Sequence, residues 1–239
     1  NKLGTEIMSM KFILSRTSDH KVHSKKWIVG YGLLFWLISR IVSMLLIVGC
    51  MAVYNTCGIN PETLTKFAGD PETAKNLGSI TYTLLTIGIV APLLEECIFR
   101  LGLSFKRWQI ALAVASIHAY MLWQHFKHLT VTSTVIYCTG IIISFTVIYF
   151  LTTDSFWLRQ KKSYYKPTVW LSAIAFGLIH LIAFSNYNLM LLPYMLCIIS
   201  VPFFAGCAIT YYRINLGFWW GVGLHVFNNL PGIIMLISQ

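Results

Sequence analysis

Long apolar runs separated by short polar segments dominate the chain. They extend over about residues 27–54, 79–100, 108–123, 131–151, 167–184, 189–209 and 216–237. A helix needs about 20 predominantly apolar residues to cross the hydrocarbon core of a bilayer, and most of these runs approach that length. We therefore expect an all-α fold, a polytopic transmembrane helix bundle of about seven to eight helices.

The composition also indicates a membrane protein. The chain has 239 residues, of which 56% are hydrophobic and only 11% are charged, with a mean hydropathy of +0.68. A soluble domain carries roughly 25% charged residues. The length leaves room for one bundle, so we divide the chain into a basic N-terminal tail, residues 1–26, and a transmembrane domain, residues 27–239.

The positive charge follows the expected topology. Of the 18 Lys and Arg residues, Arg40 lies inside the first run, and three lie in segments that alternation places outside, namely Lys66, Lys75 and Lys127. The other fourteen lie in segments placed inside if the N-terminus is inside. Because cytoplasmic loops carry the excess of Lys and Arg, we expect a cytoplasmic N-terminus. We expect Arg40 to extend to the interface or to pair with an acid of the bundle. The net charge of +10 thus reports topology, and we expect no nucleic-acid partner.

Two adjacent carboxylates stand near the end of the second run. Glu95 and Glu96 follow Pro92, and Arg100 stands four residues after Glu96. On a helix Glu96 and Arg100 can pair, whereas Glu95 points about 100° away and lacks that partner. Pro92 removes a backbone donor and is expected to kink the helix near the Glu pair. Ionisable groups at membrane depth cost ~3 kcal/mol each on insertion scales, so this motif indicates a functional site.

Histidines and an amide interrupt two later runs. His180 follows Phe176 by four residues in the fifth run, and His225 precedes Asn229 by four residues in the seventh. At this spacing the two members of each pair share one helical face. Asn228 stands next to Asn229, but the spacing from His225 favours Asn229.

Together these polar groups suit hydrolysis of an amide bond. A desolvated Glu95 can act as general base on a water, which His180 can share or orient. His225 and Asn229 can donate hydrogen bonds to a developing oxyanion. The same set also suits zinc, because two imidazoles and one carboxylate make a catalytic ligand set, with the second Glu as base. The residues leave both chemistries open.

Three patterns occur in order along the chain: EExxxR at residues 95–100, FxxxH at 176–180 and HxxxN at 225–229. Together they resemble the motifs of the CPBP intramembrane proteases, a family that includes the CAAX prenyl endopeptidases and bacteriocin-processing or immunity proteins. The resemblance covers about residues 79–237. It implies an intramembrane endopeptidase in which Glu95 activates the water and His180 is its partner at that water.

The resemblance also implies roles for the other motif residues. His225 and Asn229 would form the oxyanion hole. Glu96 and Arg100 would hold the constellation by hydrogen bonds, and Phe176 would pack near the site.

Cofactor, substrate and location are expectations that follow from the same resemblance. The family has been described both as metalloproteases and as metal-independent glutamate proteases. It therefore implies either zinc, held by Glu95, His180 and His225, or no cofactor. The expected partners are the lipid bilayer and a hydrophobic or lipidated peptide substrate. We expect an integral membrane protein in the cell membrane of a prokaryote, with the site toward the cytoplasmic half.

Two other functions fit the same residues. A non-catalytic membrane binding protein, with a bacteriocin immunity or scaffold role, would keep the motif side chains as structure. A small transporter would use the acid and the histidines as a proton relay. The sequence shows no evident inverted repeat, which weighs against a transporter.

Overall fold

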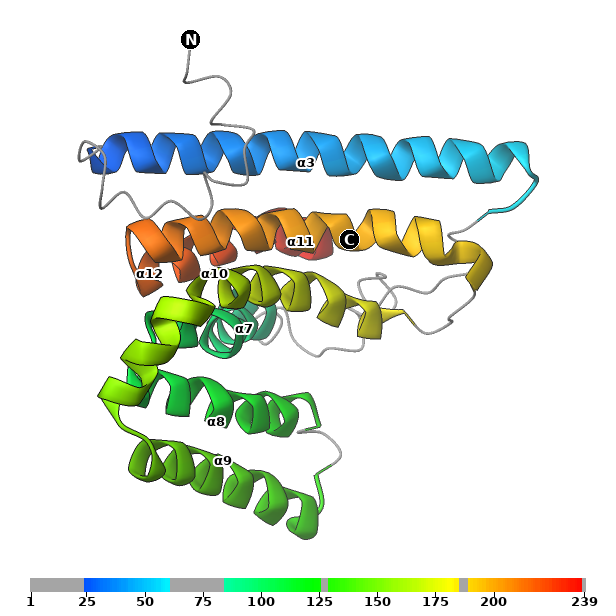
Figure 1. The fold of residues 1–239 in the computed structure, drawn as a ribbon. Helices are drawn as coiled ribbons and strands as arrows, with labels where there is room; N and C mark the ends of the chain where they lie inside the picture. The colour runs from blue at the N-terminus through cyan, green and yellow to red at the C-terminus, as the bar shows by residue number, and fades with distance from the viewer. Residues whose placement is uncertain (1–23, 61–83, 126–128, 185–188, 238–239) are drawn as a thin grey trace. The chain divides into compact units, whose positions relative to one another are not determined.

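The computed structural model describes residues 24–60, 84–125, 129–184 and 189–237 (Figure 1). Within these ranges the fold is all-α, as expected, with seven α-helices and no β-strand. Most of the predicted basic tail lies outside the described residues, as do the first residues of the predicted run 79–100. The expected cytoplasmic position of the N-terminus stays a prediction.

Each predicted apolar run contains an α-helix, although the bounds differ at several ends, most of all at the start of α10. The α-helices are α3 (Lys25–Thr56), α7 (Ala91–Arg100), α8 (Arg107–Gln124), α9 (Val131–Leu151), α10 (Asp154–Ile179), α11 (Leu192–Asn215) and α12 (Phe218–Ile237). Short helical turns complete the described chain: the π-helix η1 (Thr86–Val90) and the 3₁₀ helices η2 (Leu101–Ser104), η4 (His180–Ala183) and η5 (Leu189–Leu191).

Four of these helices are long and apolar enough to cross a membrane. They are α3, α9, α10 with its following turn (Asp154–Ile182), and α11 with the turn before it (Leu189–Asn215). α9 buries none of its residues and exposes large apolar side chains such as Ile142 and Phe150. Such a surface is unfavourable in water and compatible with lipid, which indicates a membrane protein. The other three predicted runs also contain helices, α7, α8 and α12, but these are not among the four.

Residues 154–166, predicted as a basic loop, instead form the first half of α10. The helix starts after Thr153, whose hydroxyl oxygen accepts a hydrogen bond from the N–H of Phe156, 3.2 Å away. Asp154 in the first turn complements the positive end of the helix dipole. The basic residues Arg159, Lys162 and Lys166 are exposed on the outer faces of the helix, so their charge does not require a loop.

By its internal contacts the chain forms two units. The first unit contains the described residues up to Gly88 and those from Ala173 onward. The second unit is Ile89–Ser172, so the division falls inside α10.

The first unit is built around α11, which packs against both α3 and α12. α3 and α11 run antiparallel (Figure 1). At one end of this pair the Tyr212 hydroxyl donates to the carbonyl of Val29, 2.7 Å away. At the other end the Tyr54 hydroxyl donates to the carbonyl of Met190. The core between these helices contains Ile28, Ala208, Ile209, Tyr211, Tyr212 and Leu224.

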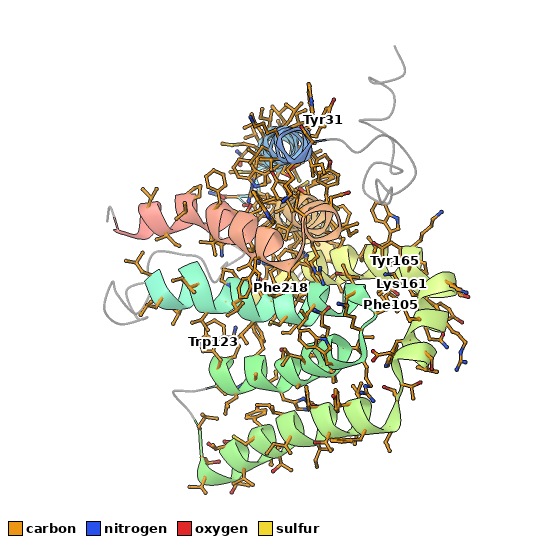
Figure 2. All side chains as sticks on the ribbon, turned by 90° about the vertical axis from the view of Figure 1, so that its left-hand side faces the viewer. Tyr31, Phe105, Trp123, Lys161, Tyr165 and Phe218 are labelled. Atoms are coloured by element: carbon orange, nitrogen blue, oxygen red, sulfur yellow. The ribbon has the colours of Figure 1, made fainter. Side chains whose placement is uncertain are left out.

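The second unit is built around α8, which packs along α9 and against α7 and η2. The backbone N–H of Arg107 donates to Oδ1 of Asp154, 2.9 Å away, and joins the start of α8 to the start of α10. The Ser172 hydroxyl donates to the carbonyl of Phe99 at 2.5 Å and joins α10 to α7. Phe105, just after η2, lies beside Tyr165 of α10 (Figure 2). The packing on α8 and η2 and the Ser172–Phe99 hydrogen bond hold α7, which carries the acidic motif.

Candidate functional site

A break in regular helix geometry precedes the acidic motif. The π-helix η1 covers Thr86–Val90, and α7 begins directly after it with Pro92 in its first turn. The expected disturbance near Pro92 therefore takes the form of a wider helical turn. π-turns inside helices are rare and occur often at functional sites.

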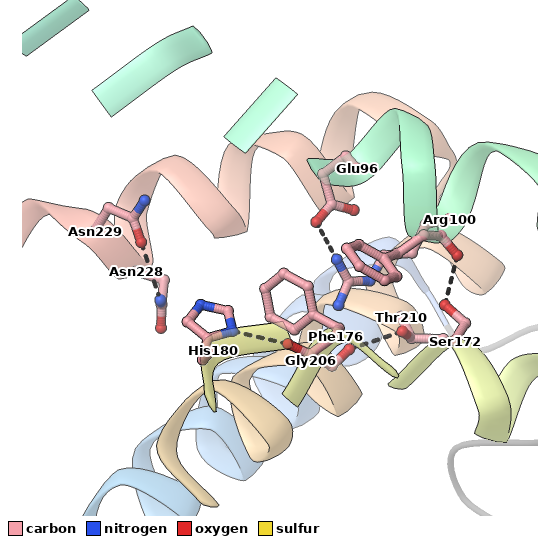
Figure 3. A network of polar contacts seen from close by, with 10 residues as sticks. Glu96, Arg100, Ser172, Phe176, His180, Gly206, Thr210, Asn228 and Asn229 are labelled. Atoms are coloured by element: carbon pink, nitrogen blue, oxygen red, sulfur yellow. Dashed lines mark hydrogen bonds and ion pairs between the residues drawn. The ribbon is translucent and has the colours of Figure 1, made fainter. Parts of the chain in front are cut away.

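Glu96 and Arg100 form the ion pair that their spacing predicts. The Arg100 guanidinium donates to Oε1 of Glu96 at 2.5 Å, and both side chains are fully buried in the second unit (Figure 3). Losing either partner would leave a buried charge without its counterion, which is far more costly than losing a pair at the surface. The pair is therefore part of the structure of α7.

Glu95 has different surroundings from Glu96. Its side chain is half-buried, and its carboxylate lies close enough to Tyr120 of α8 to interact electrostatically with the hydroxyl. The same hydroxyl accepts a hydrogen bond from Nε2 of Gln124, 2.8 Å away. Adjacent carboxylates in different surroundings can take different roles, one structural and one chemical.

Three motif residues lie together in the first unit. Phe176 is buried, and its ring lies 5.1 Å from the His180 ring and 5.4 Å from the His225 ring, centroid to centroid. Both contacts are edge-to-face, with interplanar angles of 71° and 87°. Phe176 therefore brings together histidines from α12 and from the end of α10.

The orientation of His180 is set by its own helix. Its Nδ1 donates to the carbonyl of Phe176, 2.8 Å away, at the point where α10 passes into η4 (Figure 3). In a neutral ring this hydrogen bond places the proton on Nδ1 and makes Nε2 the basic nitrogen. His180 is half-buried whereas His225 is buried. A nitrogen held in this way can accept a proton from water.

Asn229 joins α12 to the π-helix. Its side-chain nitrogen donates to the backbone carbonyl of Ile87, 3.1 Å away. Its oxygen accepts a weaker hydrogen bond from the Asn228 amide at 3.3 Å. One amide N–H of Asn229 is therefore used by Ile87, and the group has a second N–H for another acceptor.

Asn228 connects this group to α3. Its oxygen accepts hydrogen bonds from the Trp36 indole, 2.9 Å away, and from the Arg40 guanidinium, which lies 5.6 Å from the Trp36 ring centroid. The acceptor that the structure gives Arg40 is thus an amide rather than an acid, and the expectation of an acidic partner stays untested. An amide oxygen satisfies the guanidinium without placing a second charge in an apolar helix pair.

The local geometry thus gathers Phe176, His180 and His225 in the first unit and Glu96 with Arg100 in the second. No family model, curated protein or solved structure matches the chain. Among the described residues, neither unit holds three His, Cys, Asp or Glu side chains grouped as metal ligands.

Sequence reasoning missed the neighbours of the motif residues. Tyr120 beside Glu95 gives no motif signal, because it is one of several aromatic residues in its run. Asn228 was set aside by the spacing argument, although the structure uses it as the acceptor for Arg40. One signal in the sequence was available. Asn228 is a polar residue next to Asn229 in a run that contains few other polar residues, and such a residue is expected to have a hydrogen-bond partner within the bundle.

Proposed function

We propose that the chain is an intramembrane endopeptidase of the CPBP type, which hydrolyses a peptide bond of a membrane-associated or lipidated peptide with a Glu-activated water. The observation that supports it best is the contact of Phe176 with both His180 and His225. Two of the three motifs are thereby joined by direct side-chain contact, which places the two histidines close enough to act on one substrate.

In the proposed reaction Glu95 takes a proton from water, and the resulting hydroxide attacks the scissile carbonyl. His180 orients the water through Nε2, since its Nδ1–H is bound to Phe176. His225 and Asn229 donate hydrogen bonds to the oxyanion. The buried Glu96–Arg100 pair fixes α7 and leaves the chemistry to the neighbouring carboxylate.

Zinc and a metal-free mechanism remain the two forms of this proposal. Glu95, His180 and His225 have the donor types that zinc prefers. If zinc is bound, these side chains hold it and it supplies Lewis acidity. The contact of His180 Nδ1 with the Phe176 carbonyl suits both forms, because metal-ligating histidines usually donate their other ring N–H to a carboxylate, a backbone carbonyl or water.

The proposed location is the cell membrane of a prokaryote, with the site toward the cytoplasmic half. The four membrane-length helices support a membrane location. The excess of Lys and Arg in the segments assigned to the inside supports the orientation. The proposed substrate is a hydrophobic or lipidated peptide, because such a chain reaches a site within the bilayer.

The test is proteolysis of hydrophobic and prenylated reporter peptides in liposomes by wild type and Glu95→Ala, with and without a chelator. Cleavage by the wild type alone is expected, and chelator sensitivity then distinguishes the two forms. Full activity of a folded Glu95→Ala variant would overturn the proposal. Arg159→Gln, an exposed change elsewhere on the chain, serves as the matched control.

A non-catalytic binding role is the second candidate, and one observation favours it. His180 and Asn229 each already bind a backbone carbonyl, of Phe176 and Ile87 respectively. Side chains used in this way can be retained for structure alone, as in an immunity or scaffold protein. That role predicts that Glu95→Gln preserves protection in cells, whereas loss of protection at normal expression excludes it.

A further inference from the structure

Two cysteines meet where α3 packs on α11. Cys50 lies on α3 and Cys197 on α11, and both are half-buried free thiols in the structure. Their side chains are close enough for a hydrogen bond between the two thiols. Both helices belong to the first unit, so this contact lies within one unit. Thiols from segments far apart in the sequence are thus brought together.

The packing around the two thiols sets their register. The Tyr54 and Tyr194 rings are in edge-to-face contact, with centroids 6.5 Å apart. Cys50 precedes Tyr54 by four residues and Cys197 follows Tyr194 by three, so each cysteine shares a helical face with the tyrosine of its own helix. Since the helices run antiparallel (Figure 1), one turn away from the tyrosines brings both cysteines to the same level. The thiol contact therefore belongs to the regular packing of α3 on α11.

Tyr54 fastens the two helices within one turn of the thiols. Its hydroxyl donates to the carbonyl of Met190, and it interacts electrostatically with both Cys50 and Cys197. A disulfide needs its sulfurs about 2.05 Å apart and its Cβ atoms about 3.5–4.5 Å apart. Thiols already in hydrogen-bond contact reach that geometry through a small movement of the side chains or of one helix.

The thiols lie near the membrane surface. α3 has 32 residues, which extend about 48 Å at 1.5 Å per residue, whereas the hydrocarbon core is about 30 Å thick. A helix centred on the core therefore extends beyond it by about 9 Å at each end. Cys50 stands about 9 Å before Thr56, the last residue of α3. It therefore lies at the edge of the core, where water reaches a thiol, and Tyr54 beside it is typical of this interface.

The predicted topology places this edge on the outside. With a cytoplasmic N-terminus, the first membrane-spanning helix ends on the outer face, and Cys50 lies toward that end. Disulfides form and persist outside the cytoplasm and are rare within it. This step depends on the predicted topology, so the experiment includes both sides of the membrane.

We propose that Cys50 and Cys197 form a thiol–disulfide site that reacts with a small dissolved disulfide at the outer face. The thiolate of one cysteine attacks a sulfur of that disulfide, which forms a mixed disulfide and releases one thiolate. The other cysteine attacks the mixed disulfide, which forms the Cys50–Cys197 bond and releases the second thiolate. The two cysteines lose two electrons and two protons, and the dissolved disulfide becomes two thiols. This site goes beyond the proposed peptidase and does not depend on it.

The bond ties the end of α3 to a packed part of the first unit. Cys197 lies between Met195 and Ile199, which form a core cluster with Phe184. Phe184 directly follows η4, the turn that begins at His180. Oxidation is therefore expected to restrain this end of the unit and to raise the melting temperature by at least about 4 °C, as a disulfide of ordinary strength does in a chain of this size.

The test uses the full chain in detergent, treated with oxidised glutathione or with dithiothreitol. Peptide mapping by mass spectrometry under non-reducing conditions detects the linkage, and thermal denaturation measures its effect. Most oxidised chains are expected to contain Cys50 linked to Cys197, and dithiothreitol is expected to remove both the linkage and the thermal shift. No such linkage in the folded wild type, or linkage of Cys57 to Cys197 in its place, would overturn the proposal.

Serine variants provide the controls. Cys50→Ser and Cys197→Ser are each expected to abolish the linkage and the thermal shift on oxidation. Cys57→Ser changes an exposed cysteine directly after α3 and is expected to keep both. An equal thermal shift in Cys50→Ser and in the wild type would show that the bond does not restrain the unit. If a serine variant fails to fold, the mapped linkage of the wild type decides.

The side of the membrane is tested with the same reagent, because the charged oxidised glutathione does not cross a sealed bilayer. Bacterial membrane vesicles that contain the full chain are prepared right side out and inside out. Linkage is expected in the right-side-out vesicles and is expected to be absent from the inside-out ones. Linkage in the inside-out vesicles that equals or exceeds it would overturn the outer position of the site.

Discussion

The side-chain amide of Asn229 donates a hydrogen bond to the backbone carbonyl of Ile87, 3.1 Å away. In a π-helix such as Thr86–Val90 the regular donor to a carbonyl is the N–H five residues later. For Ile87 that residue is Pro92, which has no hydrogen to donate. Asn229 therefore supplies the donor that the proline removes, and it stabilises the helical turn that precedes the acidic motif.

This relationship predicts an energetic coupling between positions 229 and 92. Asn229→Ala leaves the Ile87 carbonyl without its donor and is expected to lower the free energy of unfolding by about 1–3 kcal/mol. Pro92→Ala supplies a backbone N–H, so the double variant is expected to lose less than the two single variants together. Denaturation in detergent measures all four proteins. A coupling below about 0.5 kcal/mol would show that the two positions act independently.

The acidic motif is predicted to separate into a structural and a chemical carboxylate. Glu96→Ala leaves Arg100 buried without its counterion and is expected to cost about 3–5 kcal/mol of folding stability. Glu95→Ala removes a half-buried group and is expected to cost clearly less, while it abolishes peptide cleavage. Thermal denaturation and the reporter-peptide assay are measured on the same preparations.

A compensating pair provides the control for this separation. Glu96→Leu with Arg100→Met replaces both charges by apolar side chains and is expected to recover much of the stability lost in Glu96→Ala. Equal destabilisation by Glu95→Ala and Glu96→Ala would contradict the assignment of roles.

The contact of α3 with α11 predicts opposite effects at two nearby glycines. A Cβ at Gly32 would overlap the Tyr212 ring, whereas nothing lies within 4 Å of a Cβ at Gly30. Gly32→Ala is expected to lower the free energy of unfolding by about 1–3 kcal/mol through overpacking. Gly30→Ala is expected to raise it by up to about 1 kcal/mol through helix propensity. If both substitutions stabilise the protein, the result would contradict the close approach of α3 and α11 at Gly32.

Gly177 is closely packed beside Phe176, His180 and His225, so a larger residue at this position is predicted to reduce activity. A Cβ there would lie 2.9 Å from Cβ and 3.2 Å from Cα of Phe203 on α11. The end of α10 must then move, and Phe176 and His180 move with it. Since small misplacements of reacting groups can cost up to about 100-fold in rate, Gly177→Ala is expected to lose most of the peptidase activity while it stays folded.

The matched control for this change lies on α12. Nothing lies within 4 Å of a Cβ at Gly223, two residues before His225, so Gly223→Ala is expected to keep wild-type rates. Reporter-peptide turnover and circular dichroism are measured for both variants. An unchanged rate in Gly177→Ala would mean that the position of His180 does not limit the reaction.

The helices could be predicted from the sequence because the bilayer leaves the backbone few alternatives. Within lipid every N–H and C=O must be paired internally, so an apolar run of sufficient length becomes a helix. The prediction of a loop at residues 154–166 is wrong because it treats their charge as evidence against a helix. Outside the hydrocarbon core a helix can expose charged side chains to water, and there hydropathy no longer separates helix from loop.

The candidate site was predictable where helix periodicity decides the contact. The Glu96–Arg100 pair and the approach of His180 to the backbone of Phe176 are both four-residue contacts within one helix or its end. The partner of Arg40 was not predictable, since it lies on a different helix. Asn228 and Asn229 point about 100° apart on α12, so each side chain contacts a different neighbour. The spacing of residues along α12 alone does not predict which neighbour each one contacts.

The π-helix also sets how this region tolerates insertions and deletions. A π-turn holds one residue more than the α-turn it replaces. Since an α-helix advances about 100° per residue, that extra residue rotates Glu95, Glu96 and Arg100 by about 100° relative to the segment before the turn. Deleting one residue of Thr86–Val90 would restore a regular helix and turn the whole motif by the same angle. We therefore expect the deletion of one residue there to abolish the proposed peptidase activity, although all three sequence motifs stay unchanged.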